Sequence, residues 1–257
     1  MPAEVAPSFV WVTELPSAGA RLTLAEDESH YVTRVCRGRP GDRLTATDGR
    51  GALATLRLLT AGSRAVAEVE SCERTDLERS AWVLSGAPQG ERGDWMVEKL
   101  AELGVTVFQP LDCERGRWER MRGRGERWRR LAIAALRQSR RRFLVEIRAP
   151  VPLAQALAEL PTESRRWLAD SAGTPASLAT PPLDGVAVVL IGPAGGFSPA
   201  EKASIREPDF VPIALSDSRL RSETAAMAWA CWWSGAGPAA SSVKGPAPGL
   251  DAPTGRP

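Results

Sequence analysis

The chain of 257 residues has few of the residues that many kinds of active site require. His30 is its only histidine, so neither a multi-histidine metal site nor a serine–histidine–aspartate triad is easily assembled. The four cysteines form no CxxC pair, which argues against a metal site and against a disulfide framework. Their scatter predicts reduced thiols, as in a cytoplasmic protein. They are Cys36, Cys72, Cys113 and Cys231.

Long apolar segments are also missing. No apolar run reaches the roughly 20 residues that a membrane-spanning helix needs. The opening residues MPAEVAPSFVW carry neither a basic segment nor a long apolar segment, so we expect no secretory signal. With 43% hydrophobic and 25% charged residues, the composition is typical of a globular protein of one large or two ordinary domains. We therefore expect a cytoplasmic protein with no membrane partner and no bound metal.

Lysine is rare, since it occurs only at Lys99, Lys202 and Lys244, and arginine supplies nearly all of the positive charge. The net charge of +2 says nothing by itself about nucleic acids. Between Arg115 and Arg148, however, there are thirteen arginines and three glutamates. Guanidinium groups match phosphate oxygens and stack on bases, so this cluster favours an RNA-facing surface. The alternative is a solvated helix face in a chain that prefers arginine.

Patterning divides the chain into two parts and a tail. Residues 1–74 show short strand patterns over 9–12, 43–47, 52–59 and 64–69 with turns between them, which predict a small β-barrel. One helix is expected over 26–36, with Asp27 as a candidate cap. Residues 75–235 alternate strands with helices, which predicts a parallel sheet with helices on both faces. Residues 236–257 are mostly Gly, Pro, Ala and Ser, and predict a disordered tail.

The alternating part can be located more closely. Strands are expected over 82–84, 105–111, 166–169, 186–191 and 210–214. Helices are expected over 94–103, 126–138, 153–160, 199–206 and 223–233.

Two segments that follow predicted strands carry the most information. They are 188–201, VVLIGPAGGFSPAE, and 215–225, LSDSRLRSETA. Each is a loop of small residues between a strand and a helix, which is typical of a ligand pocket at the carboxyl ends of parallel strands. No lysine follows the glycines and no GxGxxG is formed, so the pattern favours an adenosine of modest charge over a triphosphate. For the first segment alone, a plain strand–turn–helix connection is the alternative.

Together, GPxGGFSxxE and LxxxxLRSETA resemble the RsmE-type small-subunit rRNA uracil-N3 methyltransferases of the knotted SPOUT superfamily. Further matches run in order over residues 7–230, and include Glu98-Lys99, the segment 102–105 and Gln138-Ser139. The chain also departs from the family pattern. Ala194 stands where the family usually has glutamate, so the role of that carboxylate is open here. Other departures are Gln89, Val145 and the pair Ser218-Arg219.

The resemblance implies a fold and a partner set. It implies a PUA-like RNA-binding domain in residues 1–74, and a knotted SPOUT domain in residues 75–235. It implies S-adenosyl-L-methionine as the cofactor, a homodimer, and 16S rRNA within the assembled small subunit as the substrate. The expected RNA contacts are His30, Arg34, Arg37, Arg115 and Arg141. The expected cofactor contacts, mostly through the main chain, are Leu190, Gly192, Gly195, Gly196, Ile213, Leu215 and Leu220.

Methyl transfer to uracil N3 needs an in-line approach and loss of the N3 proton. Arg221 is the candidate cation near O2 or O4, although it could instead bind a phosphate or a partner subunit. Glu223 is a candidate general base, although a glutamate in a first helical turn is also an ordinary dipole partner. Ser222 could be a simple N-cap. The sequence does not decide which group takes the proton.

The expected activity is methylation of N3 of a uridine in the decoding region of 16S rRNA. One alternative is a catalytically weakened protein that only binds rRNA. Another is a SPOUT methyltransferase that acts on a different RNA position. The tryptophans of the last helix are expected either in a dimer interface or in the core of the subunit. They are Trp229, Trp232 and Trp233.

Overall fold

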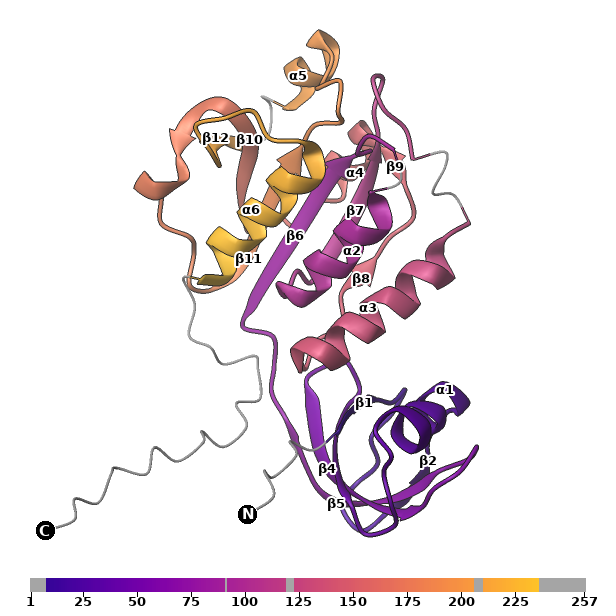
Figure 1. The fold of residues 1–257 in the computed structure, drawn as a ribbon. Helices are drawn as coiled ribbons and strands as arrows, with labels where there is room; N and C mark the ends of the chain where they lie inside the picture. The colour runs from indigo at the N-terminus through magenta and orange to yellow at the C-terminus, as the bar shows by residue number, and fades with distance from the viewer. Residues whose placement is uncertain (1–7, 91, 119–122, 206–209, 236–257) are drawn as a thin grey trace, which may run out of the picture.

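The computed structural model describes residues 8–90, 92–118, 123–205 and 210–235. Figure 1 shows two units, a smaller one at the N-terminal end and a larger one built on a second sheet. The expected tail at 236–257 lies outside the described residues. Within the described residues, no helix has both the length and the apolar character needed to cross a membrane.

The first unit is a five-stranded sheet in the order β1-β3-β4-β5-β2. Only β1 and β3 are parallel, and the other neighbours are antiparallel. In β4, Ala54, Leu56 and Leu58 are buried, so every second residue packs into one core as the alternating pattern predicts. The strands are β1 (Ser8–Trp11), β2 (Arg21–Thr23), β3 (Arg43–Thr47), β4 (Ala52–Thr60) and β5 (Val66–Arg74).

The helix expected over 26–36 is in fact two short elements. The α-helix α1 (Glu26–His30) is followed by a π-helical turn, η1 (Tyr31–Val35). The expected cap at Asp27 is wrong, because the helix starts one residue earlier, after Ala25, and has no side-chain cap. The N–H of Cys36 donates to the carbonyl of Tyr31, five residues back, which gives the wider turn.

The second unit is an all-parallel sheet in the order β12-β10-β11-β6-β7-β8, with β9 paired to β7. The sequence pattern located most of its strands, but it missed the two-residue strands β8 and β9. A trefoil knot depends on whether the chain passes through a loop of its own backbone. The order of the strands does not show this, so the knot stays a prediction. The strands are β6 (Arg79–Gly86), β7 (Val107–Asp112), β8 (Glu146–Ile147), β9 (Val151–Pro152), β10 (Ser164–Pro175), β11 (Gly185–Ile191) and β12 (Phe210–Ala214).

Helices cover both faces of this sheet. In β11, Val189 and Ile191 face a core shared with α2, α3 and α6, whereas Val188 and Leu190 face a second core with α4 and α5. A strand that is apolar on both faces reads as a continuous hydrophobic run, which explains the run over 186–191. The helices are α2 (Gly93–Glu102), α3 (Gly125–Ser139), α4 (Leu153–Ala158), α5 (Pro199–Ile205) and α6 (Ser222–Gly235).

The tryptophans of α6 pack within their own subunit. Trp229 is fully buried, and its ring stacks on Trp233 with the centroids 6.4 Å apart. Trp232 meets Trp167 of β10 edge to face at 5.5 Å and donates its ring N–H to the carbonyl of Ala176. This arrangement favours the core interpretation of these rings over the interface interpretation.

The two units meet along α3 and the segment that follows it. Arg137 of α3 pairs with the buried carboxylate of Glu28 at 2.9 Å and stacks on the ring of Tyr31. Burial raises the pKa of Glu28, and the guanidinium of Arg137 opposes that effect. Beside this contact, the carbonyl of Arg142 accepts from the hydroxyl of Thr47 at 3.0 Å. These bonds join residues about a hundred positions apart, so they fix the first unit against the second.

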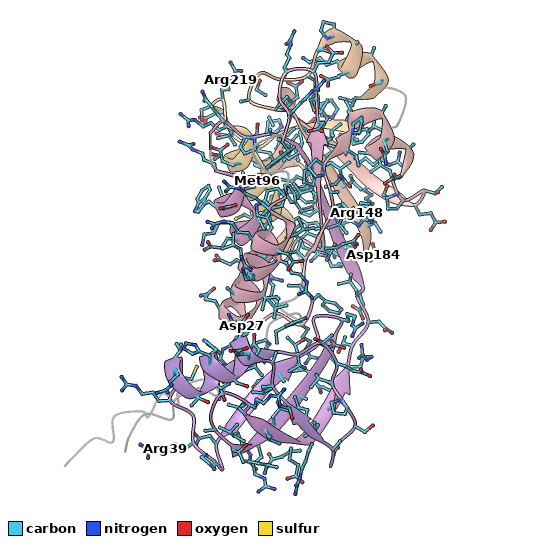
Figure 2. All side chains as sticks on the ribbon, turned by 90° about the vertical axis from the view of Figure 1, so that its right-hand side faces the viewer. Asp27, Arg39, Met96, Arg148, Asp184 and Arg219 are labelled. Carbon is cyan, nitrogen blue, oxygen red and sulfur yellow. The ribbon has the colours of Figure 1, made fainter. Side chains whose placement is uncertain are left out.

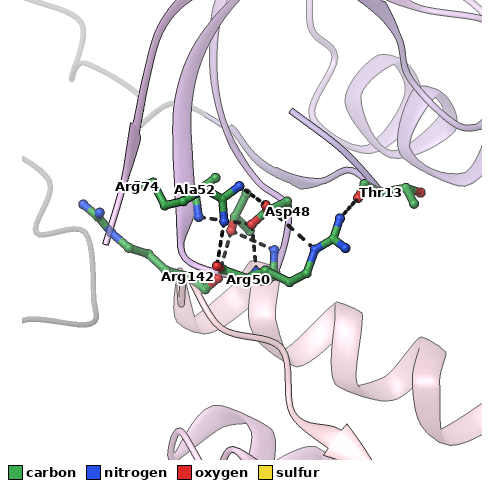
Figure 3. A network of polar contacts seen from close by, with 8 residues as sticks. Thr13, Asp48, Arg50, Ala52, Arg74 and Arg142 are labelled. Carbon is green, nitrogen blue, oxygen red and sulfur yellow. Dashed lines mark hydrogen bonds and ion pairs between the residues drawn. The ribbon is translucent and has the colours of Figure 1, made fainter. Parts of the chain in front are cut away.

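Asp48 organises the turn that faces this junction (Figure 3). Its carboxylate, only 2% exposed, accepts from the N–H groups of Arg50 and Ala52 and from the guanidinium of Arg74 at 2.7 Å. Burial alone would raise the pKa of Asp48. The N–H of Arg50 and the guanidinium of Arg74 outweigh burial and hold that pKa below its ordinary value.

Replacing Asp48 by asparagine is expected to cost about 1–3 kcal/mol of stability at neutral pH, since one oxygen becomes a donor that faces other donors. A depressed pKa stabilises the folded state above the unfolded value of 3.8, and this contribution is lost as the pH falls through the folded pKa. The difference in Tm between wild type and Asp48→Asn should therefore shrink in acid. Asp76→Asn, at an exposed carboxylate, is the control. If the difference in Tm did not change with pH, the depressed pKa of Asp48 would not be the source of this stability.

Candidate active site

A cavity of about 560 Å³ opens at the carboxyl ends of the parallel strands β11 and β12. It lies between the two loops that follow these strands, as the sequence pattern predicts, and the middle of β10, which the pattern did not predict, forms a further wall. In β10 the pairing with β12 shifts between Ala169 and Thr174, and the displaced Asp170 and Ser171 line the cavity. Its volume lies in the range of sites for small molecules, about 300–1,000 Å³.

The glycine-rich loop that follows β11 forms one wall. Gly192, Pro193, Ala194 and Gly196 all line the cavity. Gly196 has φ of 70°, a conformation that favours glycine. Pro193 is wedged against the end of β6, where a Cβ on Gly86 would lie 2.6 Å from its Cδ. Close packing of main chain on main chain therefore sets the shape of this wall.

Glu201 holds the glycine-rich loop at its far end. Its carboxylate accepts from the N–H of Ser198 at 2.7 Å, and Ser198 caps the same turn in return at 3.2 Å. This is a capping box at the start of α5. The other carboxylate oxygen accepts from the N–H of Glu114 at 2.9 Å, which ties the loop to the turn after β7.

Burial, with the neighbouring Glu201, raises the pKa of the Cys113 thiol to about 12, so this thiol stays neutral.

The second loop closes the opposite wall. Ser222 is the first residue of α6, so it is not an N-cap; its hydroxyl donates to the carbonyl of Gly192 at 2.7 Å and joins the two loops. Arg221 is exposed and lines the cavity together with Lys202 and Arg219. Two acids, Asp170 and Glu223, also line it. Three cations against two acids favour an anionic partner at the mouth of the cavity.

Glu223 lies deeper in the cavity lining and is 1% exposed. Its Oε1 accepts from Arg92 Nη1 at 2.6 Å. Arg92 immediately precedes α2, so the ion pair joins two segments 131 positions apart. Sequence reasoning missed Arg92, because no local pattern pairs it with the second loop.

The structure brings most of the predicted cofactor residues together. Five of them line the cavity, and the other two do not. The side chain of Leu190 faces the core under α4 and α5, and Gly195 packs on Arg115, whose guanidinium lies 3.5 Å from the Gly195 carbonyl. The five that line the cavity are Gly192, Gly196, Ile213, Leu215 and Leu220.

Three of the five predicted RNA contacts lie close together in the chain, in the first unit. His30 ends α1, Arg34 lies in the π-helical turn and Arg37 follows that turn. All three are exposed, and Arg37 has φ of 57°. Figure 2 shows neighbouring Arg39 at one end of the molecule and Arg219, at the cavity, near the other. A ligand that touches both places must therefore be large, as a structured RNA is.

Arg141 lies in neither place. Its Nε donates to the carbonyl of Glu102 at 2.7 Å, at the end of α2, and burial lowers the pKa of its guanidinium. Its side chain also fills the space above Gly104. This position favours a structural role for Arg141.

Many arginines of the segment 115–148 are engaged within the chain. Arg124 and Arg127 bind Asp94, and Arg129 stacks on Trp11 with its guanidinium 4.9 Å from the ring centre. Arg148 stacks on Trp82 in the same way. The cluster therefore contributes to the domain junction as well as to the surface.

No group of three or more His, Cys, Asp or Glu side chains in the described part of the chain is arranged to hold a metal ion. All four cysteines are free thiols. The cavity offers main-chain groups at its glycines and apolar side chains at Ile213, Leu215 and Leu220. That lining suits an adenosyl group of modest charge. The fold and the cavity define an α/β protein with a small-molecule site at the carboxyl edge of a parallel sheet.

Comparison with known proteins gives the class a name. A family model described as an RNA methyltransferase domain matches residues 75–234, and a model described as an RNA methyltransferase PUA domain matches residues 24–70. The chain is 30% identical over 213 residues, 80% of its length, to ribosomal RNA small subunit methyltransferase E of Synechocystis, of which the match covers 70%. The chain therefore belongs to this family of RNA methyltransferases.

Other relatives agree with this assignment. The Mycobacterium bovis protein of the same name is 28% identical over 84% of this chain and 87% of its own. A crystal structure of the Neisseria gonorrhoeae protein, bound to S-adenosyl methionine, superposes with a TM-score of 0.78 at 28% identity. That match covers 88% of this chain and 95% of the other. The expected α/β fold with an N-terminal PUA-like domain is thus confirmed.

Proposed function

We propose that the protein methylates N3 of a uridine in 16S rRNA, in the decoding region of the assembled small subunit, with S-adenosyl-L-methionine as the methyl donor. The carrying observation is the cavity between two backbone loops at the carboxyl edge of a parallel sheet, with Arg221 exposed at its mouth. The names of the relatives support rRNA of the small subunit as the substrate.

Different residues of the cavity are proposed to act on the methyl donor and on the uracil base. S-adenosylmethionine supplies an activated methyl group when bound. Gly192, Gly196 and Leu220 would hold its adenosyl part through the main chain and by apolar contact. Arg221 would place a cation where the uracil carbonyls develop negative charge as N3 loses its proton. Glu223, buried in the same lining, is the proposed acceptor for that proton.

The RNA is proposed to lie along the molecule. The exposed His30, Arg34 and Arg37 would contact backbone phosphates far from the cavity. Arg115, beside the glycine-rich loop, would contact the RNA near the target base. A homodimer is part of the proposal, and Trp95 of α2, 45% exposed, is one of the large apolar residues available for a subunit contact.

The test is transfer of a labelled methyl group to small subunits purified from cells that lack this modification. We expect incorporation into 16S rRNA and 3-methyluridine upon digestion and mass analysis. Label at another base would support the alternative RNA position. Failure to bind the donor in a calorimetric titration would overturn the proposal.

A second candidate function rests on Ala194. This residue lines the cavity with a methyl group where the family usually places a carboxylate. A protein that only binds rRNA would bind the donor and the subunit without turnover. The same labelling experiment separates the two functions.

A further inference from the structure

The ion pair between Arg92 and Glu223 is well defined by its geometry. Arg92 Nη1 lies 2.6 Å from Glu223 Oε1, which is a short charge-assisted hydrogen bond. The guanidinium is half exposed, with 47% of the side chain accessible, whereas the carboxylate is 1% exposed. The pair therefore has one partner in solvent and one at the cavity.

The second oxygen of the same carboxylate is the unusual feature. Glu223 Oε2 is buried and has no hydrogen-bond partner among the described residues. Buried carboxylate oxygens normally accept at least one hydrogen bond, because burial without one is costly. Since Glu223 lines the cavity, this unpartnered acceptor belongs to a buried carboxylate at the cavity wall.

Several charged residues on α2 and β6, two of the elements that contact α6, are engaged elsewhere. On α2, Asp94 binds two arginines and the ring N–H of Trp128. Lys99, one turn later, lies between two glutamates of its own helix. Arg79 of β6 lies at the other end of α6, where it stacks on Trp233. Arg92 is thus the cation bonded to Glu223 in the described structure.

We infer that Arg92 is a positioning residue that holds Glu223 by Oε1 and presents Oε2 to the substrate base. The inference rests on the function proposed above. In that reaction the proton on uracil N3 passes to Oε2, and the electron pair of the N–H bond stays on N3. That pair forms the new N–CH₃ bond, while the pair of the broken C–S bond stays on sulfur. Arg92 touches none of these atoms and acts only through Glu223.

The experiment is a double-mutant cycle with Arg92→Gln, Glu223→Gln and the double variant, followed by methyl transfer to small subunits. We expect Arg92→Gln to lower kcat by about 10- to 100-fold, a part of the usual contribution of a general base. The donor KM should stay within about twofold, since Arg92 lies outside the cavity lining. In the Glu223→Gln background, Arg92→Gln should change kcat by less than about twofold.

Two further variants separate positioning from a merely structural role. Arg92→Lys keeps the charge but not the planar fork, so it should restore part of kcat. Arg43→Gln, which removes an exposed ion pair with Glu70, is the matched control and should leave kcat and KM unchanged. Thermal melting and donor titration of each variant report whether it is folded.

The outcomes are distinct. An equal loss of kcat upon Arg92→Gln in both backgrounds would overturn the inference but not the proposed function. A fall in Tm and in donor affinity without a selective loss of kcat would overturn it too. Wild-type protein that binds the donor but transfers no methyl group would overturn both.

Discussion

Arg221→Ala is expected to lower kcat by about 100- to 1,000-fold, the range found when one group that stabilises a developing anion is removed. The affinity for the methyl donor should stay within about twofold. Arg221 precedes α6 and is exposed, while the part of the cavity proposed for the adenosyl group is lined by glycines and apolar residues. In the proposed function the guanidinium therefore meets the base and does not hold the donor.

The measurement pairs donor calorimetry with single-turnover methyl transfer. Arg219→Ala is the matched control, because Arg219 lies two positions earlier in the same loop and also lines the cavity. If Arg221 only bound a phosphate, its replacement should mainly raise KM for the small ribosomal subunit. If Arg221→Ala instead abolishes donor binding, the role assigned to it is wrong.

The fold could be predicted largely because its strands are apolar on both faces or alternate cleanly. The run over 186–191 and the alternation in β4 gave elements whose bounds differ by a residue or so from the structure. The two-residue strands β8 and β9 were missed, since two residues show no period. The π-helical turn at Tyr31–Val35 was missed because its wider hydrogen bond leaves no trace in residue spacing.

The site was only partly predictable. The two loops were visible because glycine and small polar residues mark close main-chain approach, and both loops do line one cavity. The Arg92–Glu223 pair was not visible, because its partners are 131 positions apart. Arg92 precedes α2 and Glu223 lies in the first turn of α6. Only the folded sheet brings the starts of these two helices together, so a local sequence pattern cannot report their contact.

The arginine cluster shows the same limit. Its density suggested one surface, but several of its members bind acids that lie elsewhere in the chain. Arg137 binds Glu28 of the first unit, and Arg142 binds Glu73. Net charge over a window cannot show which cations are neutralised by distant residues, so a cluster overstates the free positive surface.

The second large effect on the site is expected where Gly86 packs tightly against Pro193. Gly86→Ala is expected to weaken donor binding about 5- to 150-fold, which corresponds to the 1–3 kcal/mol that overpacking usually costs. Gly86 ends β6, and a Cβ there would lie 2.6 Å from Cδ and 2.7 Å from Cα of Pro193. Neither group can rotate away, because Pro193 is a ring fixed to the loop backbone.

The loop would have to shift as a whole, and with it the walls at Gly192 and Gly196. Gly125→Ala is the control, because that glycine begins α3 with no atom within 4 Å of an added Cβ and without a positive φ. It should keep donor affinity and gain about 0.5–1 kcal/mol of stability. Calorimetry of both variants decides the matter: if Gly86→Ala binds the donor as wild type does, the loop is not fixed by this contact, and the cavity owes its shape to other parts of the fold.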